Sequence, residues 1–122
     1  MSYEHIDAAR MTALARELAG DVVACLRFID DFLCAWEQRR TRVLHAVDAS
    51  GPIDDALAAL LTLATSSAMV GADSLSAAAR ELHSEARSLG NVPPRGADRL
   101  ARIGAASCDE LRHASQTWRL AS

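Results

Sequence analysis

The sequence predicts an all-α protein, folded as an up-down antiparallel four-helix bundle with a short additional helix at its N-terminus. Hydrophobic residues make up 50% of the 122 residues, but many of them are Ala and only 4% of the chain is aromatic. Ala favours helix and brings little volume, so we expect slender, closely packed helices. Breaks rich in Gly and Pro divide the chain into five helical segments, and short connections favour antiparallel neighbours. This length suits one core, so we expect a single domain over residues 1–122.

The first two expected helices meet at Gly20. The first runs from Glu4 or Asp7 to Ala19, and its apolar face is approximated by Ile6, Met11, Leu14 and Leu18. Gly20 is expected to end it, because Gly adopts the left-handed conformation at little cost. Asp21 is then expected to cap a long second helix that reaches about Asp48. That helix carries one apolar stripe at heptad-like spacing, formed by Val22, Leu26, Ile29, Leu33, Trp36, Val43 and Val47.

Three further helices follow the break at Ser50-Gly51-Pro52. The third is expected from Pro52 to Val70, where Gly71 ends it. Asp73 is expected to cap the fourth, Ser74 to Leu89, with a buried face of Leu75, Ala78 or Ala79, Leu82, Ala86 and Leu89. The stretch SLGNVPPRGA is predicted to be a loop. The fifth helix is expected from Ala97 to Leu120, with apolar contacts from Leu100, Ile103, Cys108 or Leu111, and Trp118.

The third helix is apolar on two sides. One side recurs at alternating steps of three and four residues and should face the core: Ile53, Ala56, Leu60, Leu63, Ser67 and Val70. The opposite side holds Leu57, Leu61, Ala64 and Ala68. A helix that is apolar all round is usually buried all round, whereas a helix of a four-helix bundle should show one side to solvent. We therefore expect the second side to lie in a crowded centre or to meet a partner.

Charge excludes some classes of function. The net charge is −3 and the pI is about 5.7, which argues against a nucleic-acid-binding protein. All 13 basic residues are Arg, so no Lys is present to serve as a catalytic amine or a phosphate anchor.

Three features of the sequence predict the cellular compartment: the N-terminal residues, the length of the uncharged run and the spacing of the cysteines. The first residues contain Glu4 and Asp7 and no apolar run, which is unlike a signal peptide. The uncharged run 56–72 is shorter than the ~20 residues of a membrane span and contains hydroxyl residues. Cys25, Cys34 and Cys108 form no CxxC pair and no metal-ligand spacing. We expect a soluble cytoplasmic protein with reduced, packing cysteines, no membrane contact, no metal and no cofactor.

No catalytic residue emerges from the sequence. It contains no Gly-rich phosphate loop, no set of metal ligands, and no nucleophile with a neighbouring base. Cys108 and His113 are five residues apart, a poor spacing for an ion pair on a helix. We therefore expect a binding protein rather than an enzyme.

The third helix resembles the motif of histidine-containing phosphotransfer (HPt) domains. That motif reads His-x-Leu-Lys-Gly-Ser-[Ser/Ala]-x-x-[Leu/Val]-Gly-[Ala/Ser], and six positions fit it: Leu63, Ser66, Ser67, Val70, Gly71 and Ala72. The segments HIDAARMTALARELAGD, LRFIDDFL and LSAAARELHSEAR also resemble parts of the family, so the resemblance covers nearly the whole chain. It implies an HPt-like four-helix bundle that takes part in two-component signal transduction, in a phosphorelay.

The positions that carry the family's chemistry differ in this chain. Leu61 stands in place of the phosphorylated His, Ala64 in place of the Lys, and Thr65 in place of the Gly. Leu has no nucleophile, Ala offers no charge to a phosphate, and Thr adds bulk beside the site. The resemblance thus implies a pseudo-phosphotransfer protein that binds a response-regulator receiver domain or a histidine kinase. The implied docking residues are Leu57, Leu61, Ala64, Thr65 and Ala68.

Other interpretations remain open. One alternative is plain packing of the second side of the third helix against the N-terminal helix or a bundle neighbour. Another is an assembly module that forms a homodimer through the third helix. Phosphotransfer through His45 or His83 is a further alternative, although neither is followed by Lys-Gly. The basic segment EQRRTR has two interpretations, a solvated helix face or a surface that attracts an acidic partner.

Overall fold

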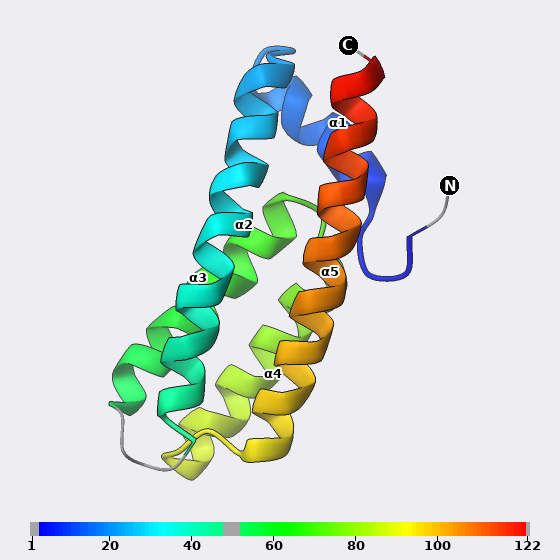
Figure 1. The fold of residues 1–122 in the computed structure, drawn as a ribbon. Helices are drawn as coiled ribbons and strands as arrows, with labels where there is room; N and C mark the ends of the chain where they lie inside the picture. Colours follow the sequence, from blue (N-terminus) through cyan, green and yellow to red (C-terminus); the bar gives the residue numbers. More distant parts are fainter. Residues whose placement is uncertain (1–2, 48–51, 122) are drawn as a thin grey trace.

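The computed structural model describes residues 3–47 and 52–121, and every regular element in them is an α-helix. The helices are α1 (Ala8–Glu17), α2 (Val22–His45), α3 (Ile53–Met69), α4 (Asp73–Leu89) and α5 (Pro94–Ala121) (Figure 1). The prediction of an all-α protein with five helices is thereby confirmed.

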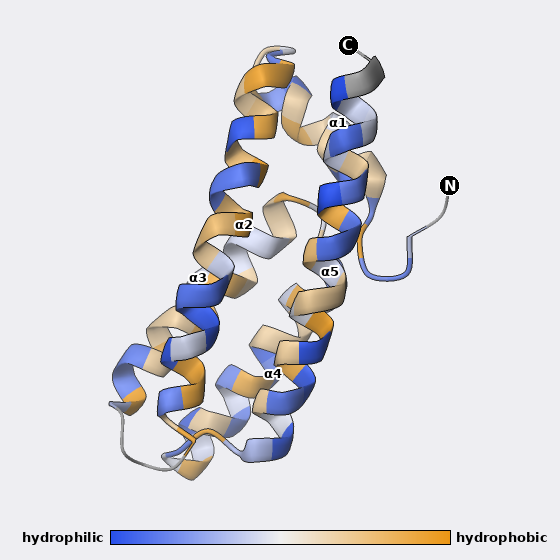
Figure 2. Cartoon of the chain, viewed as in Figure 1, coloured by the Kyte–Doolittle hydropathy of each residue, from blue (hydrophilic) through white to orange (hydrophobic). Residues whose placement is uncertain are grey.

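The four longer helices surround a common core. Each packs against the next along the chain, with the most extensive contact between α3 and α4, and α5 also packs against α2. The short α1 contacts α2 and lies across one end of the longer helices, near the C-terminal part of α5. Along α2 and α5, polar and apolar residues alternate in bands, as expected for helices with one buried face (Figure 2).

Side-chain caps begin α1 and α2. The Asp7 carboxylate accepts a hydrogen bond from the backbone N–H of Ala9 at 3.0 Å, and that of Asp21 accepts one from Ala24 at 3.0 Å. The cap predicted at Asp73 is wrong. Asp73 is the first residue of α4, Ala72 occupies the cap position, and neither makes a side-chain cap bond there.

Several helix bounds differ from the prediction. The end of α1 lies at Glu17, two residues before the expected Ala19, and two further bounds differ by three residues. α5 begins at Pro94, three residues before the expected start at Ala97, because a Pro fits the first turn of a helix, where its missing N–H costs nothing. The Ala97 N–H donates to the Pro93 carbonyl at 3.0 Å and closes this turn. At the other bound, α2 ends at His45, short of the expected Asp48, which lies outside the described residues.

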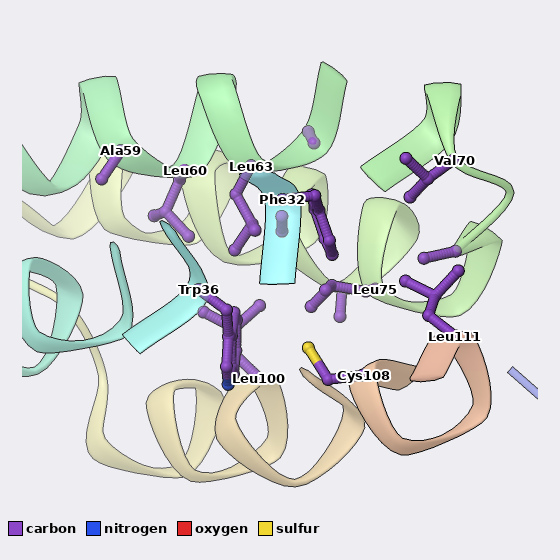
Figure 3. Packing of buried hydrophobic residues seen from close by; sticks show 14 of the residues in the cluster. Phe32, Trp36, Ala59, Leu60, Leu63, Val70, Leu75, Leu100, Cys108 and Leu111 are labelled. Carbon is purple, nitrogen blue, oxygen red and sulfur yellow. The ribbon is translucent and has the colours of Figure 1, made fainter. Parts of the chain in front are cut away.

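The predicted core face of α3 is confirmed. Ala56, Leu60, Leu63, Ser67 and Val70 are buried, and Ile53 is half-buried against the core. Figure 3 shows Leu60 and Leu63 reaching from α3 toward the region of Trp36 on α2 and Leu100 on α5. The side of α4 that holds Leu75, Ala78, Ala79, Leu82 and Ala86 is buried as well.

The Trp36 indole fits against Gly104 of α5. A Cβ atom at Gly104 would lie 1.9 Å from the Trp36 ring carbon Cη2, so this Gly makes room for the largest side chain of the core. A Gly inside a helix usually lowers stability, and here its missing side chain is what allows α2 and α5 to approach.

Three residues expected in the interior are exposed. Leu18 follows the last residue of α1, and Leu89 is the last residue of α4, so both lie where the chain turns away from the core. Cys34 is exposed on α2, whereas Cys25 and Cys108 are buried and all three are free thiols.

An N-terminal strap, residues 3–7, ties α5 to the corner between α3 and α4. The Tyr3 hydroxyl lies 2.8 Å from His113 Nδ1, and the His5 N–H donates to Glu110 Oε1 at 2.9 Å. The Asp7 N–H donates to the Gly71 carbonyl at 2.8 Å. Gly71 has φ +84°, and a Cβ there would lie 2.6 Å from the Asp7 carbonyl oxygen. Gly71 therefore ends α3 as predicted and also admits the strap.

Candidate functional site

The solvent-exposed side of α3 carries an uncharged surface. Leu61 is 51% exposed and Met69 is 44% exposed, although both are large apolar residues. Ala58, Thr62 and Thr65 are exposed on the same side, since steps of three, four and seven residues share a helix face. We call these five residues the α3 strip. A shallow hollow on it is lined by Leu61, Thr62, Thr65, Ser66 and Met69.

The hydroxyl groups beside Leu61 are bonded within the helix. The Thr65 hydroxyl donates to the Leu61 carbonyl at 3.1 Å, and the Ser66 hydroxyl donates to the Thr62 carbonyl at 2.7 Å. Such bonds to the carbonyl four residues earlier use the single hydroxyl hydrogen of each side chain. Neither hydroxyl is oriented toward a general base that would make it a nucleophile.

The structure brings together only part of the predicted docking surface. Leu61 and Thr65 are exposed, while Leu57 and Ala68 are half-buried. The expectation that Ala64 shares this exposed side is wrong, because Ala64 is buried with 1% exposure.

Ala64 is buried because α4 packs closely over it. Its carbonyl accepts hydrogen bonds from Ser76 of α4 at 2.8 Å and from Ser67 at 3.3 Å. Small residues on both helices allow this approach. Ala64 is thus closed off from solvent by α4 and cannot take part in an exposed docking surface.

Sequence reasoning missed Ala58, Thr62 and Met69, which place the centre of the exposed side further around the helix. The positions of Asp54 and Asp55 in the sequence would have identified this exposed side. Carboxylates at the start of a helix face solvent, and each is seven residues from one strip residue, Leu61 and Thr62 respectively. Charged residues would therefore have located the solvent side better than apolar periodicity did.

Arg39 of α2 borders the strip. Its side chain is half-buried, and its Nη1 donates to Ser66 Oγ at 3.2 Å. Beyond Ser66, toward the end of α3, Arg10 of α1 lines a hollow with Ala68 and Met69 and lies 4.0 Å from Asp73. The strip is thus bordered by guanidinium groups near its C-terminal end and by Asp54 and Asp55 at its N-terminal end.

The remaining candidate residues lie elsewhere. His45 is exposed at the end of α2, and His83 is half-buried on α4, next to the core residue Leu82. Burial raises the pKa of the Cys108 thiol from 9.0 to about 11, and burial also raises that of Cys25. These two thiols are therefore protonated and unreactive at neutral pH.

A metal site and a membrane-spanning helix are both absent from the described residues. No three His, Cys, Asp or Glu side chains in residues 3–47 and 52–121 gather closely enough to hold a metal ion. Within the same residues, no helix combines the length and the apolar character needed to cross a membrane. Comparisons of the chain with protein-family models, curated proteins and solved structures gave no match.

Proposed function

We propose that this chain is an HPt-like protein of two-component signal transduction that binds a receiver domain without transferring a phosphoryl group. The observation that carries the proposal is the exposure of Leu61, at 51%, on an uncharged face of α3, at the position where HPt domains carry their phosphorylated His. The protein would act in the cytoplasm as a binding protein and not as an enzyme.

The retained motif positions support the HPt resemblance because they have structural roles. Leu63, Ser67, Val70 and Ala72 are buried, and Gly71 combines a positive φ with the close approach of Asp7. A domain that kept the HPt fold but lost phosphotransfer would retain these residues, because they are needed for packing. The packing of α2 through α5, each against its neighbour, is what an up-down antiparallel four-helix bundle of HPt type requires.

The altered positions support the loss of transfer. Leu61 cannot accept a phosphoryl group. No Lys is present in the sequence, and Ala64 lies beneath α4, so no cation projects from that position. HPt domains carry Gly at the position of Thr65, one helical turn after Leu61. The larger Thr65 side chain leaves less room for a partner group to approach Leu61.

The gain from docking can be estimated for Leu61. Full burial of a Leu side chain contributes about 1.5–3 kcal/mol, so covering the exposed half of Leu61 would contribute roughly 1 kcal/mol. Met69 adds a second partly exposed side chain of similar size. The two together favour association with an apolar partner surface, and the polar residues around them would set its orientation.

A pull-down from lysate of the native cell tests the proposal, with the wild type beside Leu61→Asp. We expect the wild type to retain a protein with a receiver domain and the variant to lose it, because a carboxylate in the contact would be desolvated. The retained receiver, once phosphorylated, should leave the wild-type chain without acid-labile phosphate. Equal retention by both proteins would contradict the proposal, and so would a stable dimer that hides the α3 strip.

A further inference from the structure

We propose that Arg39 is the charged anchor of the α3 strip and selects a receiver domain that presents a carboxylate at the edge of an apolar contact. This inference rests on the proposed function and names the chemistry that the partner must offer. The partner is the receiver domain of the proposed function, and the charge of Arg39 favours it over a sensor kinase because the acidic pocket edge of a receiver would supply such carboxylates.

The position of Arg39 is fixed by Ser66. Nη1 of Arg39 donates to Ser66 Oγ across the boundary between α2 and α3, at 3.2 Å. Ser66 is itself held, because its hydroxyl donates to the Thr62 carbonyl. A guanidinium carries five N–H donors in a rigid fork, so this bond orients the group and leaves further donors for an external acceptor.

The charge of Arg39 is not paired within the described part of the chain. There, Arg40 pairs with Glu37 at 2.8 Å, Arg99 with Glu81 at 2.7 Å, and Arg112 with Asp109 at 3.1 Å. Arg10, the other guanidinium at the strip, lies 4.0 Å from Asp73. Among the residues described, no carboxylate lies within ion-pair distance of Arg39, and its bonded neighbour is the neutral Ser66.

A partner that covers the α3 strip must supply an anionic group to pair with Arg39. Contact with Leu61, Thr65 and Met69 would remove water from the adjacent, half-buried Arg39. Removing water from a charge costs free energy unless an opposite charge and hydrogen bonds replace it. A carboxylate meets this need with two parallel N–H···O bonds, which are directional and so fix the orientation of the partner.

The carboxylates at the start of α3 determine how the partner is oriented along the helix. Asp55 precedes Ser66 by 11 residues, which is about 16 Å along the helix at 1.5 Å per residue. Asp54 and Asp55 are exposed and would repel carboxylates of the partner. The acidic edge of the receiver should therefore lie over Arg39 and Ser66, with its less acidic side toward the start of α3.

Calorimetric titration of the receiver domain retained by the wild type tests this arrangement. We expect Arg39→Gln to bind roughly tenfold more weakly and with a smaller dependence on salt, because one charge-assisted contact is lost. Arg40→Gln is the matched control. It removes the same charge one residue away on a different side of α2, and should bind like the wild type. Asp55→Asn should bind equally or more tightly.

The outcomes separate this inference from the proposed function. If Leu61→Asp abolishes binding but Arg39→Gln binds like the wild type, or Arg40→Gln weakens binding equally, the role of Arg39 is overturned and the docking surface stands. If no receiver domain binds the wild type, both proposals fail. Arg39→Lys keeps the charge and loses the fork, so an affinity between those of the wild type and Arg39→Gln supports carboxylate recognition.

Discussion

The hydroxyl of Thr65 donates a hydrogen bond to the backbone carbonyl of Leu61, at 3.1 Å, on the exposed side of α3. The bond holds Thr65 beside the exposed side chain of Leu61, and it uses the only hydroxyl hydrogen that Thr65 could offer to a phosphate. The environment of Leu61 is therefore suited to contact with an apolar surface and poorly suited to phosphoryl chemistry.

A His placed at position 61 should not by itself give efficient phosphoryl transfer. We expect Leu61→His to gain phosphate from a phosphorylated receiver roughly a hundredfold more slowly than an active HPt domain, because no preorganised cation stabilises the transferred group. Acid-labile phosphate on the variant can be followed with radiolabelled phosphate, and the wild type must remain unlabelled as the control. Transfer by Leu61→His at the rate of an active HPt domain would contradict this account of Ala64 and Thr65.

Leu61 should contribute little to folding. We expect Leu61→Asp to change the free energy of unfolding by about 0.5 kcal/mol or less, as for most exposed positions. Leu63→Ala, two residues away and fully buried, should cost about 2–5 kcal/mol. Urea unfolding of both variants measures the difference. A loss at Leu61 as large as that at Leu63 would mean that Leu61 packs within the fold and is not free to bind.

Gly104→Ala should destabilise the protein, although the same change stabilises most helices by about 1 kcal/mol. The added Cβ would lie 1.9 Å from Trp36 Cη2, and relief of this clash should cost about 1–3 kcal/mol. The control is Ala105→Gly at the exposed neighbouring position, which should cost about 1 kcal/mol through helix propensity alone. Thermal unfolding checks both, and a more stable Gly104→Ala variant would disprove the contact.

The cysteines should differ in reactivity. At pH 8 we expect a thiol reagent to modify Cys34 in the folded protein and all three thiols after unfolding. The pKa of Cys108 is raised in the folded state from 9.0 to about 11. The folded state therefore holds this proton more tightly, and the resulting stability is complete below pH 9 and is lost as the pH rises through 11. Rapid modification of Cys108 in the folded protein at pH 8 would contradict its burial.

Much of the fold was predictable from the sequence, because helix ends and buried faces depend on local signals. The cap at Asp21, the end of α3 at Gly71 and the core face containing Leu60 and Leu63 follow from capping preferences and periodicity. The start of α5 was misplaced because Pro at the first helical position looks the same in a sequence as Pro in a loop.

The candidate site was predicted less well, because it depends on the approach of other helices. Leu61 and Ala64 are both apolar and lie three residues apart, so periodicity places them on one side of the helix. In the structure, α4 covers Ala64 and leaves Leu61 exposed. Likewise, the contact between Arg39 and Ser66 joins residues that are 27 positions apart on two helices. Neither relation can be read from the periodicity of one helix.

The central claim is that the α3 strip is a docking surface for a receiver domain. The most direct measurement is nuclear magnetic resonance of the isotope-labelled chain during titration with the receiver retained in the pull-down. We predict that the amide signals of Leu61, Thr62, Thr65 and Met69 shift most, while those around Glu81 and Arg99, on α4 and α5, stay in place. Shifts confined to α4 and α5, with the α3 strip unchanged, would contradict the claim.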